Sequence, residues 1–366
     1  MLRRFLRFLL LKPVMWAAAR FSSKPKREKI FKALTTLHDH ILEYPGKRGP
    51  VIPFDTTADR FIIFSDQHKG RRNGADDFTQ AEPNYLAALE HYFQEGYFFI
   101  NLGDSEELWE NNLWQVKKKN KATFEAEKKF IEKDRSVKVF GNHDLFWDND
   151  PFAWLQLRSI FKMKVKTDEG VVLKAMNAAS PLTIFLTHGH QGDAQSDGNW
   201  FSKFFVAKIW APLQSLLRIN PNTPAYDAEK KTLHNNIMYE WSSRQQQLLL
   251  ITGHTHQPVF GSLTHLERLY RQFQLAEKEN NAGQLEKLRD EIKKREKQFT
   301  AVSLNYMQLL PTYFNTGCCC FSDGDITGIE ISEGYICLVK WTNKNGLPVR
   351  QELEKALLGD LAAQIG

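Results

Sequence analysis

Five short apolar runs, each followed at once by polar residues of metal-binding type, constrain the fold of this chain more than any other feature. The runs span residues 61–64, 97–102, 137–140, 182–187 and 248–252. Their shortness and their β-branched and aromatic content are typical of buried strands rather than buried helices. Residues 82–95 and 122–133, which separate the first three runs, have apolar side chains at helical spacing. Strands that alternate with helices predict right-handed crossovers and a mainly parallel sheet.

The polar residues after these runs are candidates for one metal site, because loops at the carboxyl ends of parallel strands gather in a single crevice. One such motif alone is weak evidence, since a single His or Asp after a strand is more often a cap. Five in order favour a metal site, because burying so many carboxylates and imidazoles without cations would be costly. Six of the eleven histidines lie in these loops. The residues are Asp66, His68, Asp104, Asn142, His143, Asp144, His188, His190, His254 and His256.

These motifs closely resemble those of the calcineurin-like metallophosphoesterases: Asp-x-His, Gly-Asp, Gly-Asn-His-Asp, His and Gly-His-x-His, each after a strand. The match covers about residues 60–341. The resemblance implies an α/β fold, a four-layer α/β/β/α sandwich whose second sheet has candidate strands at 313–315, 326–331 and 335–341. We therefore expect a metallophosphoesterase domain over residues 58–345, after an arm over 1–50 and before a helical tail over 346–366.

The resemblance also implies the ligands of two divalent metal ions. One ion is held by Asp66, His68 and His256, the second by Asn142, His188 and His254, and Asp104 bridges the two. Carboxylate, imidazole and amide ligands suit manganese, iron or zinc. A water that bridges two such ions loses its proton near neutral pH and attacks phosphorus in line with the leaving oxygen.

Two further residues of the third motif are assigned catalytic roles by position. His143 lies beside a ligand and is expected to stabilise or protonate the leaving group. Asp144 either orients an imidazole or simply caps the turn.

The substrate is less well defined than the chemistry. The likeness within the family is nearest to the UDP-2,3-diacylglucosamine pyrophosphatases, through residues 102–109, 188–210 and 253–258. This chain departs from them in being much longer and in having His143 where they commonly have Arg. We expect a phosphorylated small molecule or a lipid-linked substrate, such as a nucleotide-sugar diphosphate. Candidate substrate-binding residues are Arg71 and Arg72, either anion clamps or a solvated loop, and His190, in a substrate or supporting role.

The positive charge of the chain is concentrated at its N-terminus. Residues 1–32 contain ten Lys or Arg and one Glu, so this segment carries +9 and the remainder −3, against +6 for the whole chain. An acidic body argues against nucleic acid as a partner. The first residues form a basic amphipathic pattern that suits an anionic membrane surface. A secretory signal, an organelle transit peptide and a helix packed on the body remain as alternatives.

The extra length of the chain falls mainly in two segments with helical patterns. Residues 199–247 are expected to form helices that cap the site, and residues 264–300 a charged helical hairpin. The cysteines Cys318, Cys319, Cys320 and Cys337 make a poor disulfide framework, which favours reduced thiols and a cytoplasmic location, at the inner face of the membrane if the arm binds lipid. Other functions within the same family are a protein or nucleotide phosphatase, a nuclease and a non-enzymatic scaffold.

Overall fold

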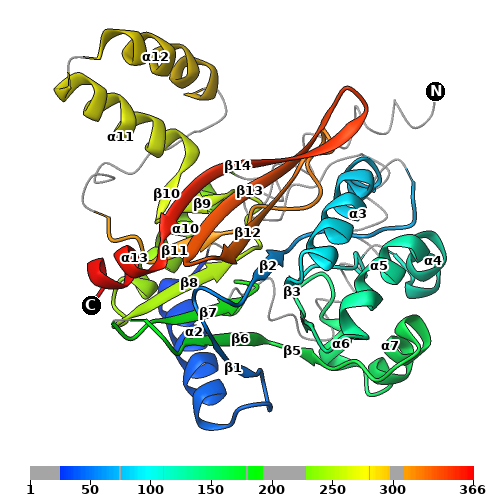
Figure 1. Ribbon diagram of the computed structural model, residues 1–366. Coiled ribbons are helices and arrows are strands. Elements are labelled where there is room, and N and C mark those ends of the chain that lie inside the picture. The colour runs from blue at the N-terminus through cyan, green and yellow to red at the C-terminus, as the bar shows by residue number, and fades with distance from the viewer. Residues whose placement is uncertain are drawn as a thin grey trace, which may run out of the picture.

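Two sheets packed face to face, with helices on their outer faces, form the body of the protein in the computed structural model (Figure 1). The structure describes residues 25–73, 76–109, 111–178, 180–192, 228–279, 281–296 and 309–366. Within these ranges each sheet has seven strands. The arrangement is the α/β/β/α sandwich expected from the sequence, and the expected second sheet is present.

Sheet I contains the first three predicted strands. Strands β2, β3, β4 and β5 run parallel, and β12, β13 and β14 extend the sheet antiparallel beyond β2. Its order is β14-β13-β12-β2-β3-β4-β5. The bounds are β2 (Phe61–Phe64), β3 (Phe98–Leu102), β4 (Ser136–Val139), β5 (Thr167–Asp168), β12 (Ile326–Ser332), β13 (Tyr335–Lys344) and β14 (Leu347–Leu357).

Sheet II contains the other two predicted strands, β7 and β8, side by side and parallel. Its order is β1-β6-β7-β8-β11-β9-β10. The bounds are β1 (Val51–Phe54), β6 (Gly170–Ala175), β7 (Thr183–Thr187), β8 (Leu248–Thr252), β9 (Val259–Phe260), β10 (Leu263–Thr264) and β11 (Tyr313–Asn315).

Apolar side chains from both sheets fill the space between them. Ile63 and Ile100 of sheet I and Leu173 and Ile251 of sheet II belong to one cluster and are inaccessible to solvent. Burial at this level is the main source of stability in such a sandwich. Because this core fixes one sheet against the other, the loops at the strand ends of sheet I keep a fixed position relative to those of sheet II.

Helices cover both outer faces. On sheet I, α3 (Phe78–Gln94) and α5 (Lys121–Ile131) bury one apolar face each. On sheet II, α2 (Arg27–Glu43) and α10 (Ala228–Ser242) pack together on the strands. A further apolar cluster, which includes Phe140 after β4, joins α4 (Leu113–Lys119), α6 (Phe146–Asn149) and α7 (Ala153–Phe161).

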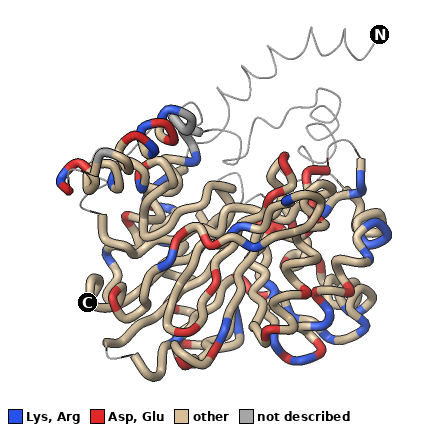
Figure 2. The backbone as a smooth tube through the Cα atoms, turned by 45° about the horizontal axis from the view of Figure 1, so that its top comes forward, with Lys and Arg blue, Asp and Glu red and all other residues tan. Residues whose placement is uncertain are grey.

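The helical hairpin expected over residues 264–300 consists of α11 (His265–Lys278) and α12 (Ala282–Glu296), which stand away from the body in Figure 1. Leu266, Leu269, Leu288 and Ile292 join the two helices. Basic and acidic residues are interspersed along their backbone, as the colours of Figure 2 show. In the other insertion, residues 193–227 lie outside the described residues and only α10 is seen before β8.

The chain ends differ from the organisation predicted from the sequence. The helical tail predicted for 346–366 is wrong for most of its length, because strand β14 pairs with β13 and only α13 (Leu358–Gln364) is helical. Asn345 and Gly346 both have positive φ, as a two-residue hairpin turn requires. Of the arm predicted for 1–50, residues 1–24 lie outside the described residues, whereas α2 belongs to the body.

None of the helices in the described ranges has the length and apolarity of a membrane-spanning helix.

Candidate metal centre

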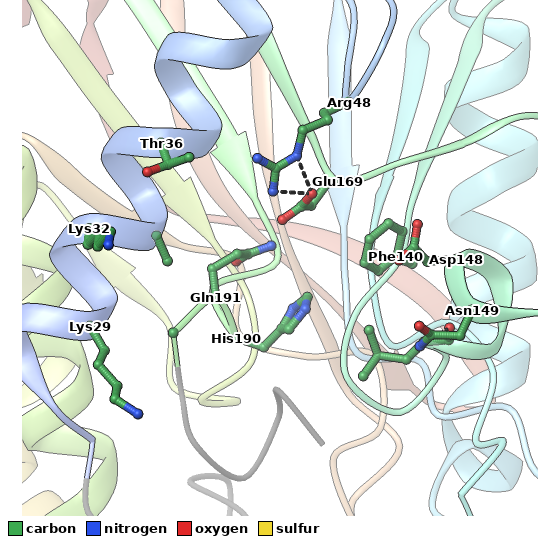
Figure 3. A pocket seen from close by; sticks show the side chains of 13 residues that line it. Lys29, Lys32, Thr36, Arg48, Phe140, Asp148, Asn149, Glu169, His190 and Gln191 are labelled. Carbon is green, nitrogen blue, oxygen red and sulfur yellow. Dashed lines mark hydrogen bonds and ion pairs between the residues drawn. The ribbon is translucent and has the colours of Figure 1, made fainter. Parts of the chain in front are cut away.

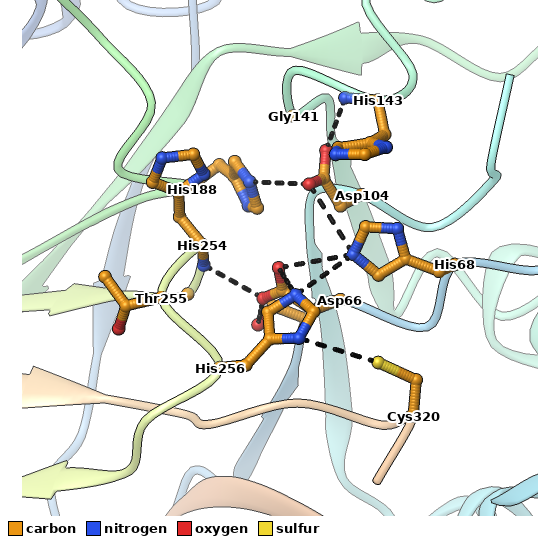
Figure 4. Close-up of polar contacts among 12 residues, drawn as sticks. Asp66, His68, Asp104, Gly141, His143, His188, His254, Thr255, His256 and Cys320 are labelled. Carbon is orange, nitrogen blue, oxygen red and sulfur yellow. Dashed lines mark hydrogen bonds and ion pairs between the residues drawn. The ribbon is translucent and has the colours of Figure 1, made fainter. Parts of the chain in front are cut away.

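The polar loops after β2, β3, β4, β7 and β8 meet at one place, between the carboxyl ends of the strands of both sheets (Figure 4). The backbone there is unusual. Positive φ angles occur at the predicted ligands Asp66, His68, Asp104, His254 and His256. Residues other than glycine hold this conformation only where the surrounding structure enforces it, which is common at functional sites.

The first group of predicted ligands is closely packed. The Nε2 atoms of His68 and His256 are 3.1 Å apart, and Asp66 Oδ1 lies 3.1 Å from the Nε2 of His256 and 3.7 Å from that of His68. Two imidazole nitrogens and a carboxylate oxygen that face one another form a donor set for a single cation.

The second group adjoins the first through Asp104. Asp104 Oδ2 lies 3.8 Å from His68 Nε2 and 3.2 Å from His188 Nε2. Asp104, His188 and His254 each present a ligand atom, all within 4.8 Å of one another. In the described part of the chain the buried Oδ1 of Asn142 has no hydrogen-bond partner. Asp104 is therefore placed between the two predicted groups.

The hydrogen bonds of two histidines determine which ring nitrogen faces the centre. His188 Nδ1 is 2.9 Å from the carbonyl oxygen of Leu102, which can only accept, so this nitrogen carries the proton. His68 Nδ1 is 2.9 Å from Glu107 Oε2. In both rings Nε2 is then left with a lone pair for a metal ion.

Electrostatics at the centre favour positive charge. Burial lowers the pKa of His188, but the Asp104 and Asp66 carboxylates raise it more, to about 9. The same carboxylates would also attract a divalent metal ion, because it carries twice the positive charge of a proton.

His143 is held on several sides. Its ring stacks on Trp109 at 4.4 Å and 20° and meets the edge of His68 at 4.6 Å. Its Nδ1 is 2.7 Å from Glu107 Oε2, and its backbone N–H donates to Asp104 Oδ1. Burial raises the pKa of Glu107, but His143 and His68 lower it more, to about 2. Sequence reasoning did not identify Glu107 as a site residue.

Asp144 caps a turn and does not orient an imidazole. Its Oδ1 accepts from the backbone N–H of Gly141 at 2.6 Å and its Oδ2 from that of Ser105 at 2.9 Å. Its hydrogen bonds in the described residues go to backbone N–H groups, and burial raises the pKa of this carboxyl to about 6. Of the two roles considered for Asp144, the turn cap is the observed one, because its oxygens are already engaged.

The predicted substrate-binding residues lie in different surroundings. Arg72 pairs with Glu82 of α3 and lies over the ring of Phe78, so its guanidinium is engaged away from the histidines. Arg71 is exposed. His190 is buried, with its ring 5.4 Å from that of His188. Of the three, His190 has its ring against a predicted ligand.

A buried ionic network connects the loops that follow β2, β3 and β4. Lys69 Nζ is 2.6 Å from Glu127 Oε1 and 3.1 Å from Glu106 Oε1. Lys138 Nζ and Trp147 Nε1 both donate to Glu106 Oε2, at 2.9 and 2.7 Å. Lys69, Glu106 and Lys138 lie three, two and four positions from Asp66, Asp104 and Asn142 in the sequence, and charge near the metal motifs was the only signal for the network.

Cys320 was also missed by sequence reasoning as a neighbour of the centre. It is buried, and its Sγ lies 3.8 Å from His256 Nδ1. Hydrogen bonding to the outer nitrogen of a ligand histidine orients the ring.

The donor set therefore fits a pair of divalent cations. Imidazole, carboxylate and amide donors converge from two sheets, one carboxylate adjoins both groups, and a buried amide oxygen lacks a partner. The structure thus brings Asp66, His68, His188, His254 and His256 together around Asp104.

Comparisons with known proteins identify the family of the chain. No curated protein matches the chain. Similar solved structures include a dimetal phosphatase from Danio rerio (8% identity, TM-score 0.37) and Vacuolar Protein Sorting 29 from Cryptosporidium parvum (11%, TM-score 0.32), each covering 82% of this chain and 99% of its own. Residues 59–258 match the family model described as calcineurin-like phosphoesterase. The chain belongs to the calcineurin-like phosphoesterase family.

Proposed function

We propose that this protein hydrolyses a phosphoester or diphosphate bond with the help of two divalent metal ions. Manganese, iron and zinc fit the donors. The observation that carries the proposal is the position of Asp104 Oδ2, between His68 Nε2 and His188 Nε2. Asp66, His68 and His256 would hold one ion, Asn142, His188 and His254 the other, and Asp104 both.

The bound ions would supply an activated water and positive charge for the phosphoryl oxygens. The protein's own residues do the rest. Glu107 Oε2 lies 2.7 Å from Nδ1 of His143, an ion-pair contact that would stabilise the charged imidazole, and Nε2 of that ring would stabilise or protonate the leaving oxygen. Trp109 restricts the ring by stacking on it. Glu107 also orients His68, so one carboxylate contacts both a predicted metal ligand, His68, and the proposed general acid, His143.

We propose a phosphorylated small molecule or a lipid-linked diphosphate as the substrate. The resemblance of residues 102–109, 188–210 and 253–258 to UDP-2,3-diacylglucosamine pyrophosphatases supports this class. The basic residues within 1–32 support association with an anionic membrane surface.

Metal analysis and hydrolysis of 4-nitrophenyl phosphate test the chemistry. The purified protein should bind about two first-row metal ions per chain and lose activity with a chelator. Asp104→Asn should abolish turnover, because the shared carboxylate is lost. His143→Ala should reduce kcat by about 100- to 10,000-fold, the usual contribution of a general acid, while both metals stay bound.

His40→Ala, on α2, is the matched control and should retain full activity. Wild-type rates in both Asp104→Asn and His143→Ala would end the proposal. A panel of phosphomonoesters, phosphodiesters, nucleotide-sugar diphosphates and lipid-linked diphosphates, with and without anionic liposomes, then identifies the substrate class. Activity confined to phosphopeptides or nucleic acid would contradict the proposed class.

A further inference from the structure

A cavity of about 580 Å³, lined by both polar and apolar side chains, lies beside the metal centre (Figure 3). One wall is the first half of α2, and the others come from the loops after β4 and β7. These two loops also carry Asn142, His143 and His188, and the ring of His190 in the cavity wall is 5.4 Å from that of His188. The cavity therefore adjoins the metal centre across the ring of His190.

The α2 wall carries positive charge. Lys29 and Lys32, three residues apart on one face of the helix, both line the cavity. Among the described residues neither ammonium group has an ion-pair partner. Arg48 is different, because it contacts Glu169 at 2.7 and 2.6 Å and neutralises that acid. Asp148 is then the remaining acid of the lining.

Two buried polar atoms in the lining lack partners in the described part of the chain. They are Nε2 of Gln191 and Nδ1 of His190, on side chains that are each 4% exposed. Gln191 Oε1 accepts from the N–H of Gly189, which identifies Nε2 as the free donor. A buried donor without an acceptor costs about 1–3 kcal/mol, so a ligand that accepts from it is favoured.

The cavity is formed by the folded chain and does not depend on a ligand to close it. Ile30 and Leu34 of α2 are completely buried against sheet II. Gly192, at φ +76°, lets the β7 loop touch α2, since a Cβ there would lie 2.6 Å from the carbonyl oxygen of Lys29. The backbone positions of Lys29 and Lys32 are thus fixed relative to Gln191.

From these contacts we propose, on the basis of the hydrolysis proposed above, that the cavity binds a second phosphoryl group of the substrate. The phosphoryl group that is cleaved lies at the metal centre, and the second accepts from Lys29, Lys32 and Gln191. The substrate class is then a bisphosphate or diphosphate. Helix α2 precedes residues 59–258, so this wall lies outside the segment that matches the family model.

The test compares two probes that differ by one phosphoryl group, glucose 1-phosphate and glucose 1,6-bisphosphate. With manganese-loaded full-length protein, the bisphosphate should have the lower KM by about tenfold, from charge-assisted hydrogen bonds at the second group. In K29A/K32A this preference should disappear, while hydrolysis of 4-nitrophenyl phosphate is unchanged. Gln191→Glu should weaken it as well, because a donor is replaced by negative charge.

The matched control is K119A/K133A, which removes two exposed lysines that do not line the cavity. It should keep the preference. Calorimetric titration of both sugar phosphates into metal-loaded His143→Ala, in which turnover is slowed, measures binding separately from hydrolysis. Failure of hydrolysis alone then overturns the proposed function and leaves the cavity proposal tested. Equal affinity of the wild type for both probes, or an unchanged preference in K29A/K32A, would overturn the cavity proposal.

Discussion

At the scale of single residues, one carboxylate serves two imidazoles of the centre. Glu107 Oε2 lies 2.9 Å from His68 Nδ1 and 2.7 Å from His143 Nδ1. Glu107→Gln keeps the size of the side chain but removes its charge and one acceptor. We expect kcat for 4-nitrophenyl phosphate to fall by about 10- to 100-fold, as for other groups that orient ligand histidines.

The measurement is made at saturating manganese with metal content determined in parallel. Glu125→Gln, an exposed change on α5, is the control. Wild-type activity in Glu107→Gln would show that the two histidines do not need the charge of the carboxylate between them.

Asp144 makes a prediction of the opposite kind, on stability. Both of its oxygens accept from backbone N–H groups, of Gly141 and Ser105. Asp144→Asn turns one acceptor into a donor that faces an N–H, which should lower the free energy of unfolding by about 1–3 kcal/mol. Urea unfolding of metal-free protein measures this, with exposed Asp134→Asn as the control. A loss of activity without a loss of stability would instead support a direct catalytic role.

The sequence indicated the predicted ligand residues more clearly than the residues that contact and orient them. Asp66, His68, Asp104, His188 and His254 sit in short motifs whose spacing to the strand end is itself the signal. Glu107 and Cys320 act through partners far away in the chain, and charge or a thiol in a sequence does not name its partner. For the same reason the ion pair of Arg72 with Glu82 was not foreseen.

At the scale of elements, the buried ionic network connects the loops that follow the strands of sheet I. Lys69 is inaccessible to solvent and contacts Glu127 and Glu106. Lys69→Met leaves both carboxylates buried with less compensation, and the free energy of unfolding should fall by about 3–5 kcal/mol.

Urea unfolding of Lys69→Met is compared with Lys129→Met as its control. Lys129 pairs with Glu90 at 2.6 Å on the surface, with both side chains nearly half exposed, and such a pair contributes about 0–1 kcal/mol. Equal losses in the two variants would show that burial does not strengthen the role of Lys69.

The secondary structure that sequence reasoning identified was local in origin. Strands β2, β3, β4, β7 and β8 were predicted from compact apolar runs. Strand β14 was mistaken for part of a helical tail, although Asn345-Gly346 is a strong hairpin signal. Its burial alternates weakly, because it is the edge strand of sheet I, and its charged residues resemble a solvated helix face.

At the scale of the whole molecule, the sandwich places sequence-distant strands side by side. Sheet II begins with β1, ends with β10 and takes β11 from beyond the α11–α12 hairpin. No local pattern reveals such an order, and only the family resemblance predicted a second sheet. The site depends on the packing of the two sheets, because Asp66, Asp104 and Asn142 follow strands of sheet I whereas His188 and His254 follow strands of sheet II.

Metal ions at this position would cross-link the two sheets, so their removal should loosen the whole sandwich. Ions that bind only the folded chain raise its unfolding free energy by about 2.7 kcal/mol at a free concentration of 100 times Kd. Thermal unfolding with manganese and with chelator should show this difference in the wild type. In Asp104→Ala it should largely vanish, because both groups lose the carboxylate between them. His40→Ala should keep the full difference, and a stabilisation by manganese of equal size in Asp104→Ala would place the bound ions elsewhere on the protein.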